Sequence, residues 1–276
     1  MIENKYIEPR DERYSIPRKK LLKDNLKGKG NVRLIGETGT GKTTLVHDII
    51  EENEWNLFET VINRDTTKYD LLTSQVLENG NTKVKEGIVT KWIKSDGPSV
   101  LYLDGWNYAS SDLLALVESL ADFRGSINIS DLGEKFYRDD EHYIIISMNP
   151  STYTGTKNTN KAQIRRFTSI VFPYLQPKQE AKAIYQKSDM DEKSLCLELS
   201  YFAHNIRQSE VSQPIDLGSL INYANLIVNE KYDFNTIVEL YKGSLPPRER
   251  ESGKIETLYS KARKKAEETE PWEDEI

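Results

Sequence analysis

Apolar and polar positions repeat with two different periods along the first 172 residues. Short apolar runs suited to buried strands lie at residues 31–35, 57–62, 99–103 and 142–147. Runs with apolar positions three and four residues apart, the period of an amphipathic helix, lie at residues 43–52, 87–94 and 111–123. Strands that alternate with helices predict an α/β fold, with a mostly parallel sheet covered by helices on both faces.

The pattern changes after Pro173 and Pro177, where only helical periods remain. These predict helices at residues 178–187, 192–205, 217–229 and 234–241. We therefore divide the chain into a basic N-terminal segment with a short helix (1–30), an α/β core (31–174), a smaller all-helical domain (175–245) and a C-terminal segment (246–276). The last segment is highly charged and ends in a run of acidic residues, which predicts a partly disordered tail.

Composition narrows the class of protein further. The single cysteine, Cys196, excludes a disulfide scaffold and a cysteine-based metal site, and it fits a reducing compartment. No apolar run approaches the ~20 residues that cross a bilayer, and the charged N-terminus has no apolar signal region behind it. We therefore expect a cytoplasmic protein with no membrane partner. A net charge of −6 argues against general attraction to nucleic acid, although a local basic channel remains possible.

A phosphate-binding motif follows the first predicted strand and precedes the first long helix. It reads Gly36, Glu37, Thr38, Gly39, Thr40, Gly41, Lys42 and Thr43, which matches G-x-x-x-x-G-K-[ST] in full, and Thr44 follows it as a further candidate for nucleotide binding. The glycines let backbone N–H groups surround an anion, and the helix N-terminus adds partial positive charge. In this class of site the lysine, Lys42, reaches the β and γ phosphates and the hydroxyl of Thr43 binds Mg²⁺. The motif predicts that the chain binds ATP with Mg²⁺.

A carboxylate at the end of a second apolar strand would complete the metal site. Residues 100–103 form such a strand, and Asp104 follows it. Sites of this class hold the metal through a carboxylate in that position. We therefore predict that Asp104 and Thr43 share the Mg²⁺ ion.

These motifs resemble those of AAA+ ATPases, in the branch that contains the MoxR, dynein-related and cobalt-chelatase-like ATPases. The resemblance rests on the sequence GETGTGKTT and on the apolar strand that ends in Asp104, with Asn107 three residues later. Residues 146–150 are similar to the sensor 1 strand of the family, which implies that Asn149 positions the attacking water. The resemblance spans about residues 17–172 and implies that the helical domain is the lid.

The same resemblance implies a ring. Tyr153, Gly155, Ala162 and Arg166-Phe167 parallel a family pattern whose terminal arginine acts on the nucleotide of the neighbouring subunit. Arg166 is the first candidate for this arginine finger and Arg165 the second. Both residues also fit an ordinary solvated helix end.

The chain departs from the family at two positions. The family places a water-activating glutamate directly after the metal-binding aspartate, and this chain has Gly105 there. Glu37, Asp112 and Glu118 are possible substitutes, and nothing in their spacing selects one. The lid segment 214–219 lacks the family's sensor 2 arginine, and the nearby Arg207 reads as a surface residue of a helix.

Three functions are compatible with this sequence. The first is a ring, hexameric as the family resemblance implies, that couples ATP hydrolysis to remodelling of a partner protein. In relatives this partner often carries a metal-dependent adhesion-type domain. The second is a nucleotide-gated assembly or switch subunit that hydrolyses little ATP, because Gly105 replaces the glutamate. The third is a nucleic-acid motor of the restriction or viral type. An insertion at residues 124–140 resembles a family hairpin that faces the pore or a partner, and it equally fits a plain surface hairpin.

Overall fold

The fold consists of two compact units. A computed structural model describes residues 5–11, 13–78, 81–150 and 165–273. The first unit, which we call the sheet unit, comprises Glu12–Glu37 and Gly41–Phe172. The second, the helical unit, comprises Met1–Asp11, Thr38–Thr40 and Pro173–Ile276.

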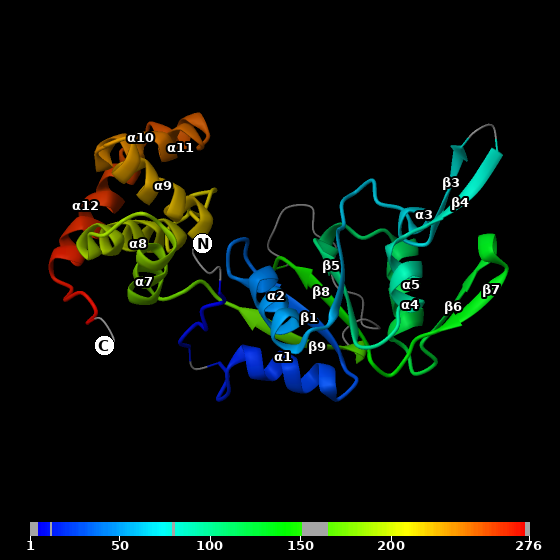
Figure 1. The fold of residues 1–276 in the computed structure, drawn as a ribbon. Coiled ribbons are helices and arrows are strands. Elements are labelled where there is room, and N and C mark those ends of the chain that lie inside the picture. The colour runs from blue at the N-terminus through cyan, green and yellow to red at the C-terminus, as the bar shows by residue number, and fades with distance from the viewer. Residues whose placement is uncertain (1–4, 12, 79–80, 151–164, 274–276) are drawn as a thin grey trace. The chain divides into compact units, whose positions relative to one another are not determined.

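The sheet unit alternates strands and helices as the sequence predicts (Figure 1). Its elements are α1 (Arg18–Lys27), β1 (Asn31–Gly36), α2 (Lys42–Asn53), β2 (Asn56–Val61), α3 (Lys68–Leu71), β3 (Thr73–Glu78), β4 (Asn81–Glu86), α4 (Ile88–Ile93), β5 (Ser99–Asp104), η1 (Trp106–Tyr108), α5 (Ser111–Ala121), β6 (Ser126–Ile129), η2 (Ser130–Leu132), β7 (Glu134–Tyr137), β8 (His142–Met148) and β9 (Phe167–Phe172).

The main sheet is five-stranded and parallel, in the order β2-β5-β8-β1-β9. Strand β1 pairs with β8 on one side and β9 on the other, so the strand that leads into the P-loop lies inside the sheet and not at its edge. The register places Ile35 beside Met148 and Leu103 beside Ile146. Because the strands are parallel, the carboxyl ends of β1, β5 and β8 meet at one edge of the sheet, where ligands bind in open α/β folds.

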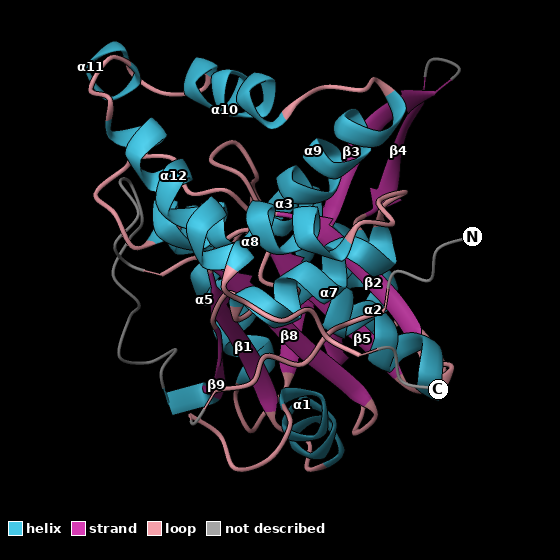
Figure 2. Cartoon of the chain, turned by 90° about the vertical axis from the view of Figure 1, so that its left-hand side faces the viewer, coloured by secondary structure: helices cyan, strands magenta, loops and turns pink. Residues whose placement is uncertain are grey.

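Helices cover both faces of this sheet (Figure 2). On one face Leu101, Leu103, Ile144 and Ile146 form a core with residues of α4 and α5. On the other, α1 and α2 pack against β1. The predicted α/β class, with a parallel sheet between helical layers, is confirmed.

Two hairpins are added to the sheet unit next to α4 and α5 (Figure 1). Strands β6 and β7 form the hairpin that the sequence predicts within residues 124–140. Strands β3 and β4 form a second hairpin, which the sequence analysis did not predict. Its exposed Leu77 and Val84 lie on the same face as polar residues, which weakens the alternation that identifies a strand.

The helical unit has its own apolar core. Its helices are α7 (Pro177–Lys187), α8 (Lys193–Arg207), α9 (Leu217–Asn229), α10 (Phe234–Gly243), α11 (Pro247–Arg250) and α12 (Lys254–Glu267). No helix among the described residues is long and apolar enough to cross a membrane.

Arg207 is a buried residue of this unit, which contradicts the expectation of a surface position. Its guanidinium donates to both carboxylate oxygens of Glu180, at 2.8 and 3.0 Å. It also donates through Nε to the carbonyl oxygen of Ile215 at 2.7 Å, and it lies 3.9 Å from the ring centroid of Tyr174. A bidentate pair with these extra contacts is the arrangement that lets a charge be buried. Arg207 therefore ties the end of α8 to α7 and to the segment before α9.

The C-terminal segment is also more ordered than the sequence predicts. Within residues 246–276, for which the sequence predicts a partly disordered tail, α11 and α12 form, and α12 packs along α8. Ile255, Ala262 and Ala266 are buried on one side of α12, with Leu258 and Tyr259 partly buried beside them. This apolar stripe consists partly of alanines within a charged helix, so the composition of the segment does not reveal it.

Candidate phosphate-binding site

The predicted P-loop connects the end of β1 to the start of α2. Gly39 has a φ of +75° and Gly41, the residue before α2, has a φ of +84°. Glycine adopts this left-handed region without steric cost, which explains the need for glycine at these two places. The first N–H groups of a helix have no partner within the helix, so α2 offers donors to an anion.

The side chain of Lys42 is hydrogen-bonded to the backbone of its own loop. Its Nζ donates to the carbonyl oxygens of Gly36 at 2.7 Å and Glu37 at 2.8 Å. Burial lowers the pKa of Lys42 to about 8, and the nearby carboxylates of Asp104 and Glu37 oppose this shift. The charge of Asp104 therefore acts on Lys42, and the two carbonyl oxygens hold its ammonium group within the P-loop.

Asp104 lies at the carboxyl end of β5. The backbone N–H of Gly105 donates to its Oδ1 at 2.8 Å, and the hydroxyl of Ser147 on β8 donates to the same oxygen. Within the described part of the chain, no hydrogen bond ends on Oδ2. One carboxylate oxygen is thus anchored while the other remains available.

The hydroxyl of Thr43 has a partner on β5, the strand that ends in Asp104. Its Oγ1 lies 3.1 Å from the hydroxyl of Tyr102, which is wholly buried two residues before Asp104. The sequence did not single out Tyr102 or Ser147, although each is a polar residue within an otherwise apolar strand.

Thr43 and Asp104 fit a magnesium ion carried by a nucleotide. A hydroxyl and one carboxylate are hard oxygen donors, and protein sites for Mg²⁺ with nucleotides use few side chains because water and phosphate complete the shell. Among the described residues, no group of three or more His, Cys, Asp or Glu could hold a metal by itself. This donor set favours Mg²⁺ with ATP over a metal held by protein alone.

Gly105 occupies a turn that does not accept a side chain. Its φ is +75°, and a Cβ built there would lie 2.7 Å from the carbonyl oxygen of Ile62. Real Cβ atoms do not approach backbone oxygens this closely. The backbone geometry of this turn therefore favours glycine at position 105, where the family has a glutamate.

Asn107 holds the backbone of Asn149. Its Nδ2 donates to the carbonyl oxygen of Asn149 at 2.9 Å, and its Oδ1 accepts from the N–H of Asn149 at 2.7 Å. Asn107 is buried, and Asn149 comes directly after β8. The structure therefore brings the sensor 1 candidate next to the turn that carries Asp104 and Gly105.

The arginine finger candidates lie directly before β9. Arg165 is exposed, and Arg166 is partly buried with Nη2 3.9 Å from Oδ2 of Asp122. Tyr153, Gly155 and Ala162, which belong to the same family pattern, lie outside the described residues.

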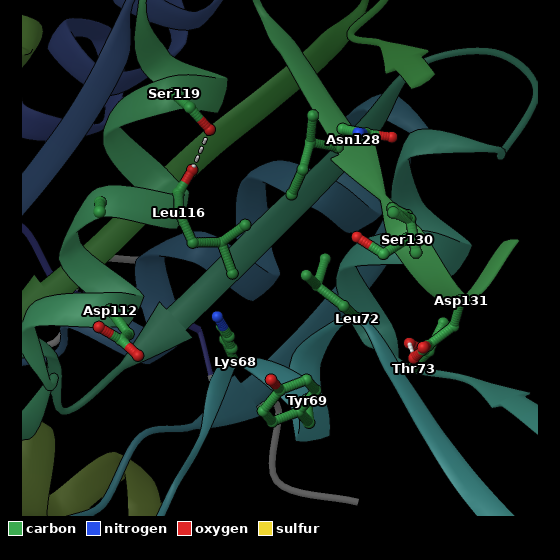
Figure 3. A pocket seen from close by; sticks show the side chains of 13 residues that line it. Lys68, Tyr69, Leu72, Thr73, Asp112, Leu116, Ser119, Asn128, Ser130 and Asp131 are labelled. Atoms are coloured by element: carbon green, nitrogen blue, oxygen red, sulfur yellow. Dashed lines mark hydrogen bonds between the residues drawn. The ribbon is translucent and has the colours of Figure 1, made fainter. Parts of the chain in front are cut away.

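The possible substitutes for the missing glutamate occupy different surroundings. Glu37 belongs to the P-loop and acts electrostatically on Lys42. Asp112 lines a cavity of about 430 Å³ between α3, α5 and β6, opposite Lys68 and Tyr69 (Figure 3). Glu118 lies on α5, and its Oε1 is buried without a hydrogen-bond partner. Of these three residues, Glu37 is the one whose charge acts on Lys42 and whose carbonyl oxygen accepts a hydrogen bond from it.

Comparison with known proteins agrees with this geometry. Residues 31–167 match the family "AAA domain (dynein-related subfamily)". The chain is 27% identical to Protein CbbQ of Hydrogenophilus thermoluteolus over 162 residues, which are 57% of this chain and 58% of that protein. It is 25% identical to Protein NorQ of Paracoccus denitrificans over 160 residues, which are 58% of each chain.

A third relative is similar over the same extent. The Denitrification regulatory protein NirQ of Stutzerimonas stutzeri is 24% identical over 160 residues, again 58% of each chain. The match thus spans somewhat more than half the length of these curated relatives. The P-loop between β1 and α2, the strand order and these matches lead to one conclusion: this chain is an AAA+ protein of the MoxR-like, dynein-related branch, with its AAA domain at residues 31–167.

Proposed function

We propose that this chain binds ATP with Mg²⁺, forms a ring and couples the nucleotide state to remodelling of a partner protein. The observation that carries the proposal is the meeting of Lys42, Thr43 and Asp104 at one edge of the sheet. Lys42 and the amides of residues 36–44 hold the phosphates, while Thr43 and Asp104 hold the ion. Magnesium would neutralise phosphate charge and orient the γ phosphate.

The other residues act on the reacting phosphate. Asn149, held by Asn107, orients the attacking water. Arg166, with Arg165 as the second candidate, is supplied to the nucleotide of a neighbouring subunit in a hexameric ring. An arginine contributes most where charge builds up on the transferred phosphoryl group, so supplying it from a neighbour makes hydrolysis depend on assembly.

A second function is favoured by one specific observation, the turn at Gly105. Since no side chain fits at that position, the subunit lacks the usual water-activating carboxylate. ATP would then be bound and hydrolysed little, and the ring would act as a nucleotide-gated switch. A nucleic-acid motor has no comparable observation in its favour.

Steady-state ATP hydrolysis with Mg²⁺ tests these alternatives. Wild type is compared with Lys42→Ala, which removes the phosphate contact, and with Lys20→Ala, a control that removes an exposed lysine from α1. Turnover well above the Lys42→Ala background supports the remodelling ATPase, and stimulation by DNA or RNA that falls steeply with salt would replace it with the motor. ATP-dependent rings in sedimentation with negligible turnover support the switch. Equal ATP binding by wild type and Lys42→Ala would overturn the proposal.

A further inference from the structure

Strand β5 has a polar side chain in an unexpected position. Tyr102 lies between Leu101 and Leu103, whose side chains belong to the core on the α5 side of the sheet. Side chains alternate along a strand, so Tyr102 and Asp104 project toward the opposite face, where α2 begins. Tyr102 is wholly buried, and burying a phenol is unfavourable unless its hydroxyl is hydrogen-bonded.

The hydroxyl of Tyr102 lies beside one of the two predicted metal ligands. It is 3.1 Å from Oγ1 of Thr43, within hydrogen-bond distance. The hydroxyl of Ser147, on the neighbouring strand β8, donates to Oδ1 of Asp104. Tyr102 and Ser147 therefore supply one hydroxyl group to each predicted metal ligand.

The direction of these hydrogen bonds matters for metal binding. A threonine hydroxyl has one proton and two lone pairs, and it binds a cation through a lone pair. Its proton must then point away from the ion to an acceptor, which the oxygen of Tyr102 provides. With a cation bound, Thr43 would thus donate to Tyr102, while Ser147 donates to Oδ1 of Asp104.

We propose that Tyr102 is a positioning residue for the magnesium site. Its hydroxyl accepts the proton of Thr43, so that a lone pair of Thr43 faces the ion beside Oδ2 of Asp104. The inference rests on the proposed function, since it assumes that this site takes a magnesium nucleotide.

The test is the effect of Mg²⁺ on nucleotide affinity in a Tyr102→Phe variant. The substitution removes only the hydroxyl and keeps the ring that fills the core. The affinity for a fluorescent ATP analogue is measured at saturating Mg²⁺ and in EDTA, and the ratio of the two values is compared. We expect the ratio to fall about two- to tenfold, the value of one hydrogen bond, with the affinity in EDTA unchanged.

Two further variants separate positioning from packing. Ser147→Ala should lower the ratio in the same direction, because it removes the hydroxyl that holds Oδ1 of Asp104. Tyr143→Phe is the matched control, since this buried tyrosine projects from the neighbouring strand on the same side of the sheet and stacks on Trp55. It should leave the ratio unchanged.

A double-mutant cycle gives the decisive readout. If Tyr102 acts through Thr43, adding Tyr102→Phe to Thr43→Ala should lower the ratio no further. Additive losses, or a Tyr102→Phe ratio equal to wild type, overturn this inference and leave the proposed function intact. A wild type that binds the analogue no better with Mg²⁺ than in EDTA overturns both. A Tyr102→Phe protein that loses thermal stability but keeps the ratio shows that the hydroxyl is structural only.

Discussion

Position 105 illustrates how a single backbone conformation limits the chemistry of the site. Gly105 combines a φ of +75° with a carbonyl oxygen 2.7 Å from where a Cβ would lie. Gly97 has a similar φ, +73°, with open space around it. Gly97→Ala should therefore lower the free energy of unfolding only by the cost of the left-handed backbone conformation. Gly105→Ala should lower it further, by about 1–3 kcal/mol or more. Urea denaturation measures both, and equal losses would contradict the contact with Ile62.

The same geometry predicts that the missing carboxylate cannot be restored by one substitution. A Gly105→Glu variant must open the turn that holds Asp104, because the hydrogen bond from Gly105 N–H to Asp104 belongs to that turn. We expect ATP hydrolysis no faster than wild type and a lower melting temperature. Faster hydrolysis at unchanged stability would show that the turn adapts to a side chain.

Lys42 makes nucleotide affinity depend on pH. Its pKa is lowered to about 8 by burial, and phosphate binding requires the protonated form. Below pH 8 the lysine is already charged, whereas above it binding must take up a proton. The affinity for the ATP analogue should therefore fall as pH rises above 8, approaching tenfold per pH unit. Lys42→Ala should bind weakly at every pH without this slope, and a flat wild-type profile from pH 7 to 10 would contradict the lowered pKa.

At the scale of elements, Arg207 and Glu180 join α8 to α7 through a bidentate ion pair with both side chains buried. Removing one partner of a buried ion pair leaves the other charge uncompensated, so Arg207→Ala should cost about 3–5 kcal/mol. Replacing both partners with apolar residues, as Arg207→Met with Glu180→Leu, should recover much of the loss. Arg263→Ala breaks an exposed pair with Glu267 and should change stability by about 0.5 kcal/mol or less. Denaturation of all three variants separates these cases.

The elements also show what sequence could and could not predict. Four strands of the sheet and the P-loop were predictable because apolar runs and a glycine-rich motif are local patterns, whereas β9 was not predicted. Arg207 was not, because its burial depends on Glu180, 27 positions away in the chain and on another helix. The contact between Asn107 and Asn149 joins residues 42 positions apart and is likewise invisible in one sequence. Local chemistry was predictable here, and pairing across elements was not.

At the scale of the whole molecule, the folded structure extends into the C-terminal segment through α12. Composition favoured a disordered tail after residue 245, but Tyr259 of α12 stacks on Phe234 at 4.7 Å between ring centroids and meets the edge of Phe202 at 6.0 Å. Both partners belong to the core of the helical unit. A chain that stops at residue 246 should therefore lose α12, expose this aromatic cluster and bind a hydrophobic dye.

Two chains of different length test this prediction. The chain ending at residue 246 should show a melting temperature lower by several degrees for the helical unit, because burying a side chain such as Ile255 alone contributes about 1.5–3 kcal/mol. The chain ending at residue 273 keeps α12 and should melt like the full protein. Calorimetry and limited proteolysis distinguish the two chains. If the shorter chain melts unchanged and resists protease, α12 adds nothing to the helical core, and the charged composition of the segment was the better guide.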